Sequence, residues 1–103
     1  MKSSTELVQE IIKRFREIRN SQVQGYYSFG YIRETENAVI VSRETGQDTR
    51  IPFSKIETTI DAVRSDDSVY SEGPSALRRY GITHVNSPTW SLLHMLSLEE
   101  ILK

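Results

Sequence analysis

Ala38-Val-Ile-Val-Ser-Arg43 and Asp48-Thr-Arg-Ile51, joined by Glu44-Thr-Gly-Gln47, form the stretch of sequence that decides the fold. The two runs predict the strands of a β-hairpin, because Gly46 supplies the positive φ that a tight turn needs. Proline cannot donate a hydrogen bond to a sheet, so Pro52 predicts that the second strand ends there or lies at an edge.

A further strand is predicted before this hairpin. Residues 24–33 are aromatic and alternate between two faces, with Tyr27 and Tyr31 on one side and Tyr26 on the other. Gly30 indicates a bulge or a close backbone approach. Three strands joined by short turns predict an antiparallel meander.

Helical periodicity begins at the N-terminus. Apolar residues recur at three- and four-residue steps from Leu7 to Ile18, and Ser3 with Glu6 has the spacing of a capping box. We therefore expect a helix that starts at Ser3 and ends near Asn20.

The same periodicity continues after the hairpin. Phe53 to Val63 predicts a second helix, for which Ser54 and Glu57 form another capping box, and residues 65–68 read as a loop. Three short helical segments follow, namely Gly73–Gly81, a helix capped by Ser87 that runs to Leu96, and a turn capped by Ser97 and Glu100.

These elements predict a single α+β domain over residues 1–103. We expect an N-terminal helix, a three-stranded antiparallel meander and short C-terminal helices packed on one face of the sheet. Trp90 is predicted to lie in the core, because a large aromatic residue at helical spacing is normally buried. The open face would then carry arginines and either Tyr26 or Tyr31.

Composition excludes several classes of function. The 103 residues contain no cysteine, which removes disulfides, thiolate zinc sites and cysteine nucleophiles. A net charge of −1 gives no global attraction to nucleic acid or to an anionic membrane. No segment resembles a signal peptide or is long enough to span a bilayer, so we expect a cytoplasmic protein without membrane contact.

The sequence also offers no catalytic or metal-binding motif. His84 and His94 lack the spacing of metal ligands, and there is no glycine-rich phosphate loop. We therefore predict no metal and no cofactor, and an enzyme is the least supported class. It would require His84 or His94 to meet Asp66, Asp67 or Glu72 in a pocket.

Arginines supply the one candidate binding surface. No acidic residue occurs between Glu72 and Glu99, and Arg78 and Arg79 fall within this interval. Phosphate backbones are bound by such segregated positive charge. The further candidates for nucleic-acid contact are Arg14, Arg16, Arg33 and Arg43. For Arg14 and Arg16 the alternative is a solvated helix face near its C-terminal end, where the dipole favours cations.

Part of the chain resembles small modules fused to bacterial restriction-type or helicase-type proteins. The resemblance spans Phe29 to Leu93 and lies in the Thr-Gly turn of the hairpin, in Arg50-Ile-Pro52, in Gly73-Pro-Ser75 and in Ser87-x-x-Trp-Ser-Leu-Leu93. It implies a context related to DNA and implies no activity.

The leading hypothesis is a non-enzymatic binding module whose partner is nucleic acid, with DNA first. The alternative is a structural or protein-interaction subunit, which we expect to form a homodimer through its first helix or its sheet because a small core gains from shared apolar area. The two differ in whether Arg78 and Arg79 point outward together or are held by neighbouring carboxylates.

Overall fold

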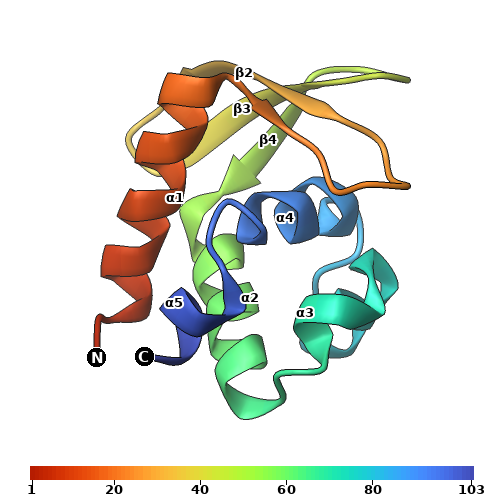
Figure 1. Cartoon of the computed structure of the whole chain (residues 1–103). Helices are drawn as coiled ribbons and strands as arrows, with labels where there is room; N and C mark the ends of the chain where they lie inside the picture. The colour runs from red at the N-terminus through yellow and green to blue at the C-terminus, as the bar shows by residue number, and fades with distance from the viewer.

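A computed structural model of the chain describes residues 1–103 and shows an antiparallel sheet with all the helices on one side of it (Figure 1). The α+β prediction is confirmed. The sheet has four strands in the order of the chain, which are β1 (Asn20–Ser21), β2 (Phe29–Glu34), β3 (Ala38–Arg43) and β4 (Thr49–Pro52). The prediction of three strands missed β1, because a two-residue strand is too short to show a period of two.

Register places the apolar side chains of the sheet on its inner face. Val39 lies opposite Ile51, and both are fully buried. Ile40 lies opposite Arg50 and, across the bulge at Tyr31/Arg33, opposite Arg33, so these side chains share the outer face. One face is therefore packed, and the other carries arginines as predicted.

Helix α1 (Ser4–Ile18) begins with the predicted capping box. Ser3 Oγ accepts a hydrogen bond from Glu6 N at 3.1 Å, and the Glu6 carboxylate accepts one from Ser3 N at 3.0 Å. The buried stripe of the helix consists of Leu7, Val8, Ile11, Ile12 and Phe15. The apolar face of α1 therefore packs against one side of the core.

Tyr31 shows how α1 meets the sheet. The Phe15 ring contacts the Tyr31 ring edge-on, with centroids 5.4 Å apart. Tyr31 thus faces the helices, and the prediction that it could lie on the open face was wrong. Tyr26 does not lie on that face either, because it belongs to the loop before β2.

Helix α2 (Phe53–Ser65) starts immediately after β4, and its predicted capping box is absent. Pro52 occupies the N-cap position, so Ser54 lies inside the first turn and cannot cap it. The carbonyl of Asn37 accepts the Phe53 N–H at 2.9 Å instead. A backbone group from the neighbouring β-turn therefore replaces the expected side-chain cap.

The C-terminal third folds into four short helices: α3 (Val69–Glu72), the 3-10 helix η1 (Pro74–Tyr80), α4 (Asn86–Leu93) and α5 (Leu98–Leu102). Helix α3 was not predicted. Ser87 was expected to cap its helix, but α4 starts at Asn86 without a side-chain cap. Trp90 is 3% exposed, which confirms its predicted place in the core. None of the helices is long and apolar enough to cross a membrane.

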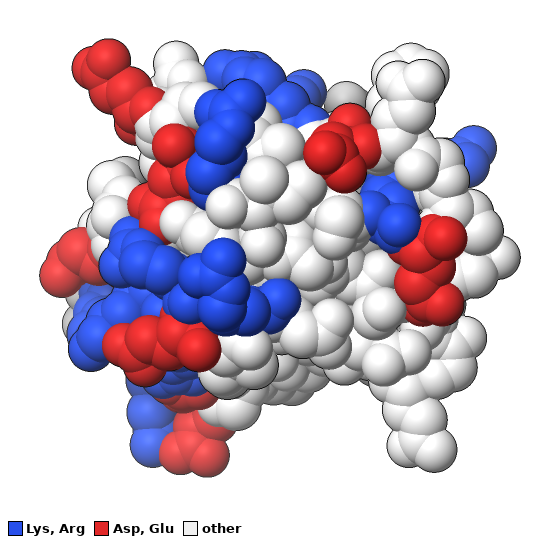
Figure 2. Space-filling view, turned by 90° about the horizontal axis from the view of Figure 1, so that it is seen from above, with Lys and Arg blue, Asp and Glu red and all other residues white.

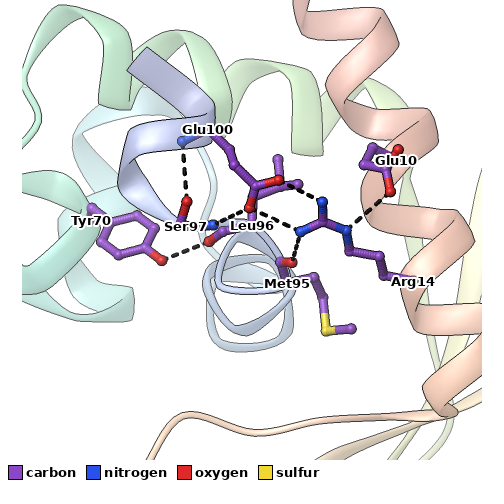
Figure 3. A network of polar contacts seen from close by, with 7 residues as sticks. All are labelled: Glu10, Arg14, Tyr70, Met95, Leu96, Ser97 and Glu100. Carbon is purple, nitrogen blue, oxygen red and sulfur yellow. Dashed lines mark hydrogen bonds and ion pairs between the residues drawn. The ribbon is translucent and has the colours of Figure 1, made fainter. Parts of the chain in front are cut away.

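A polar clamp joins α5 to α1 (Figure 3). Arg14 donates to the carbonyl of Met95 at 2.8 Å and binds the carboxylates of Glu10 and Glu100. The Glu100 carboxylate also accepts the Ser97 N–H at 2.9 Å, which completes the predicted capping box of α5. The hydrogen bonds from Arg14 and from Ser97 N–H lower the pKa of Glu100 to about 2.

This clamp predicts a pH-dependent contribution to stability. Glu100→Gln keeps a residue that can cap α5 but removes the negative charge. We therefore expect the free energy of unfolding to fall by about 1 kcal/mol at neutral pH, a small change because solvent screens the Arg14–Glu100 pair. A lowered pKa stabilises the fold above the unfolded value of 4.5, and this contribution disappears as pH falls from 4.5 to about 2. Urea unfolding of both proteins across this range measures the difference.

Glu99→Gln is the matched control, because Glu99 lies on the same helix and pairs only with exposed Lys103. It should change stability by less than Glu100→Gln does. A stability difference for Glu100→Gln that persists unchanged near pH 2 would contradict the role of the clamp.

Candidate functional site

The two N-terminal arginines predicted to contact nucleic acid form ion pairs within the fold. Arg14 belongs to the clamp described above. Arg16 binds Glu34 through two parallel hydrogen bonds of 2.6 and 2.9 Å, and this contact lowers the pKa of the Glu34 carboxyl. Both guanidinium groups are therefore compensated by carboxylates.

Arg79 and Arg43 are also engaged. Arg79 lies 3.2 Å from a Glu72 oxygen and 3.9 Å from an Asp66 oxygen, and its hydrogen bonds lower the pKa of Glu72. Arg43 donates to Thr49 Oγ1 at 2.8 Å and to the His84 carbonyl at 3.2 Å. Arg79 is thus held by neighbouring acids, the arrangement that weakens the case for a polyanion.

Arg33 and Arg78 have no carboxylate partner, and they lie apart. Arg33 is on the outer face of the sheet, whereas Arg78 lies on η1 beside the loop before β2. Figure 2, which looks onto the sheet, shows basic and acidic atoms side by side, mostly on the left and in the upper right of this face, and a broad uncharged area from the centre to the lower right. The structure therefore does not gather the predicted arginines into one patch.

The histidines do not assemble a catalytic or metal site. The His94 ring contacts the tilted rings of Tyr70 and Trp90, whose centroids are 4.0 and 4.3 Å away. His84 lines a shallow hollow beside Arg43, and neither Asp66 nor Glu72 lines this hollow. No group of three histidine, aspartate or glutamate side chains is placed to hold a metal ion.

The largest hollow lies at the junction of the sheet and the C-terminal helices. Its volume is about 760 Å³, and we call it the tyrosine groove. The residues that line it are Gln22, Gly25, Tyr26, Tyr27, Glu44, Glu72, Gly73, Pro74, Ser75, Arg78, Asn86 and Ser87. The lining residues form two walls, one from the loop between β1 and β2 and one from η1 and the start of α4. Figure 1 shows this loop above the start of α4.

The first wall is the loop from Gln22 to Ser28. Gly25 takes a φ of +91°, and the Tyr26 N–H donates to the Val23 carbonyl at 2.9 Å, so this segment is a turn rather than the predicted strand. The Tyr26 ring packs on the Trp90 ring with centroids 5.0 Å apart. Tyr27 remains 60% exposed. One tyrosine is anchored on the core, and the next is free for a partner.

The second wall is formed by η1 and the start of α4. Asn86 Nδ2 donates to the Pro74 carbonyl at 3.2 Å and holds these segments together. Gly73 has φ +112° and ψ 174°, and a Cβ at this position would lie 3.0 Å from Tyr26 Oη. Glycine is therefore required both by the backbone and by the closeness of Tyr26.

Two smaller hollows extend the tyrosine groove. The next one shares Tyr27, Glu44 and Ser87 with it, and a third shares Arg43 and Thr45 with the second. Together they follow the surface from η1 to the β3–β4 turn. The three hollows together form a long and shallow groove, which suits an extended peptide better than a compact small molecule.

Sequence reasoning missed the residues of this groove. Tyr26 and Tyr27 were assigned to a strand, and Ser87 was explained as a helix cap. Gly25 was the available signal for a turn, because glycine is favoured in turns that need a positive φ. No sequence signal placed Arg78 beside these tyrosines.

Comparison with known proteins gave no match, whether with family models, with curated protein sequences or with solved structures. The resemblance to modules of restriction-type or helicase-type proteins accordingly stays a prediction.

Gly73 offers a direct test of how the groove is built. We expect Gly73→Ala to destabilise the fold by about 1–3 kcal/mol, because only glycine adopts this backbone conformation without strain. Thermal or urea unfolding measures the loss. Ser75→Ala, two residues away and exposed, is the control and should be close to neutral. Equal stability of the two variants would contradict the requirement for glycine at φ +112°.

Proposed function

We propose that this protein is a non-enzymatic protein-interaction module that binds a segment of another polypeptide in the tyrosine groove. The observation that carries the proposal is the composition of the groove, in which two adjacent tyrosines face serines, glycines and an asparagine. Tyrosine gives a large contact area at low entropic cost, and the small polar residues give adaptable hydrogen bonds, which is why antibody paratopes use the same set.

Charge favours a polypeptide over nucleic acid at this site. The groove contains the single guanidinium of Arg78 and the two carboxylates of Glu44 and Glu72. A phosphate backbone requires an excess of cations, whereas a polypeptide carries both signs. Most of the other candidate arginines already have acidic or carbonyl partners. Binding of nucleic acid stays a prediction that Arg33 and Arg78 alone would have to support.

The predicted homodimer has less support than a separate partner. The exposed large apolar side chains include Ile18, Ile32 and Leu102, which belong to α1, β2 and α5. A stable interface between copies requires a contiguous apolar patch, and these three side chains come from three separate elements of the fold.

A selection from a phage library of random peptides tests the proposal. We expect peptides that bind the protein and alter the emission of Trp90, the only tryptophan, because Tyr26 transmits contact from the groove to this ring. Tyr27→Ala should weaken these peptides about tenfold, equivalent to about 1.4 kcal/mol, because an exposed tyrosine at the centre of an interface is a typical hot spot. Calorimetric titration measures the affinities.

Ile32→Ala is the control, because Ile32 is exposed on β2 outside the groove and its loss should leave peptide affinity unchanged. A labelled DNA duplex is titrated in parallel at low and high salt. If DNA binds with an affinity that falls as salt rises, and no selected peptide depends on Tyr27, nucleic-acid binding replaces the proposed function.

A further inference from the structure

We propose that the polypeptide bound in the tyrosine groove presents an acidic side chain to Arg78, so that the module recognises extended segments with a carboxylate at one fixed position. This inference rests on the proposed function and specifies the chemistry of its partner. It follows from which polar groups in the groove already have partners within the chain and which do not.

Both acids of the groove already have a hydrogen-bond partner within the chain. Glu72 binds Arg79 and also accepts a hydrogen bond from Ser68 Oγ at 2.7 Å. Glu44 accepts the backbone N–H of Ser28, where it holds the entry to β2. Both carboxylates therefore form contacts within the chain, which reduces their capacity to bind a cationic ligand.

Arg78 differs from every other charged group in the groove. It lies on η1 next to Arg79, yet its guanidinium forms neither an ion pair nor a hydrogen bond within the chain, although the carboxylates of Glu72 and Glu44 line the same groove. Its guanidinium is exposed and borders the groove. A guanidinium binds a carboxylate through two parallel hydrogen bonds, so an acidic side chain is the complementary ligand group.

Two hydroxyl groups accompany Arg78. Ser75 on η1 and Ser87 on α4 both line the groove, and neither hydroxyl forms a hydrogen bond within the chain. Each can donate to a carboxylate oxygen. Three unused donors thus border one hollow, and the exposed Tyr27 ring on the opposite wall can contact an apolar neighbour of the acidic residue.

The shape of the site favours an extended segment over a free acid. The groove continues through the hollow at Tyr27, Glu44 and Ser87 towards Arg43 and Thr45. A short acid would fill only the end at Arg78. A peptide in extended conformation would occupy the whole length and would place alternate side chains towards the groove.

The experiment repeats the phage selection on the wild-type protein and on Arg78→Glu. We expect the wild type to enrich peptides with Asp or Glu at one position, and Arg78→Glu to enrich Lys or Arg there. For peptides selected on the wild type, Arg78→Gln should lower the affinity about tenfold, and this difference should shrink as salt is raised. Competition with free glutamate should have no measurable effect.

Arg33→Gln is the matched control, because it removes the same charge from an exposed arginine that lacks an acidic partner and lies outside the groove. It should leave affinity within about twofold of the wild type. Peptides that depend on Tyr27 but share no acidic position would overturn this inference and leave the proposed function standing. Peptides that show no dependence on Tyr27 would overturn both.

Discussion

Burial of one face of the sheet is the constraint on which the rest of the structure depends. Val39, Val41 and Ile51 are fully buried, and Phe15 of α1 reaches the same layer through Tyr31. Since side chains alternate between the faces of a strand, packing the inner face leaves the outer one to arginines and half-buried residues. The core thus lies between the inner face of one sheet and the helices packed against that face (Figure 1).

Arginines connect the helices and strands at the edges of this core. Arg14 connects α1 to α5, and Arg16 connects α1 to β2. Arg64 donates to the carbonyls of Ile101 and Lys2 at 2.8 and 2.7 Å, which ties the two ends of the chain to α2. A guanidinium with five donors suits this task, because it satisfies carbonyls at chain and helix ends and carboxylates together. Many of the arginines therefore form contacts within the chain and are not free to bind a partner.

The tyrosine groove arises where two irregular segments meet beside the regular layers. The turn around Gly25 and the outer side of the 3-10 helix η1 border solvent, although Ala76 and Leu77 of η1 are buried in the core. Tyr26 is nevertheless fixed by Trp90 and lies close to Gly73. A wall that is rigid at its base and exposed at Tyr27 loses little entropy when a partner binds, which favours a binding surface at this place.

Local chemistry allowed the sequence alone to determine much of the fold. The strand at Ala38–Arg43, the positive φ at Gly46 and the capping boxes at Ser3 and Ser97 depend on neighbouring residues only, and each was predicted correctly. The tertiary structure decided the caps at α2 and α4, the side to which Tyr31 points, and the partner of each arginine. These depend on groups distant in the chain, such as Asn37 for Phe53 and Glu100 for Arg14, whose approach no local pattern encodes. For the same reason, only the folded chain brings Arg78 and Tyr27 to opposite walls of one groove.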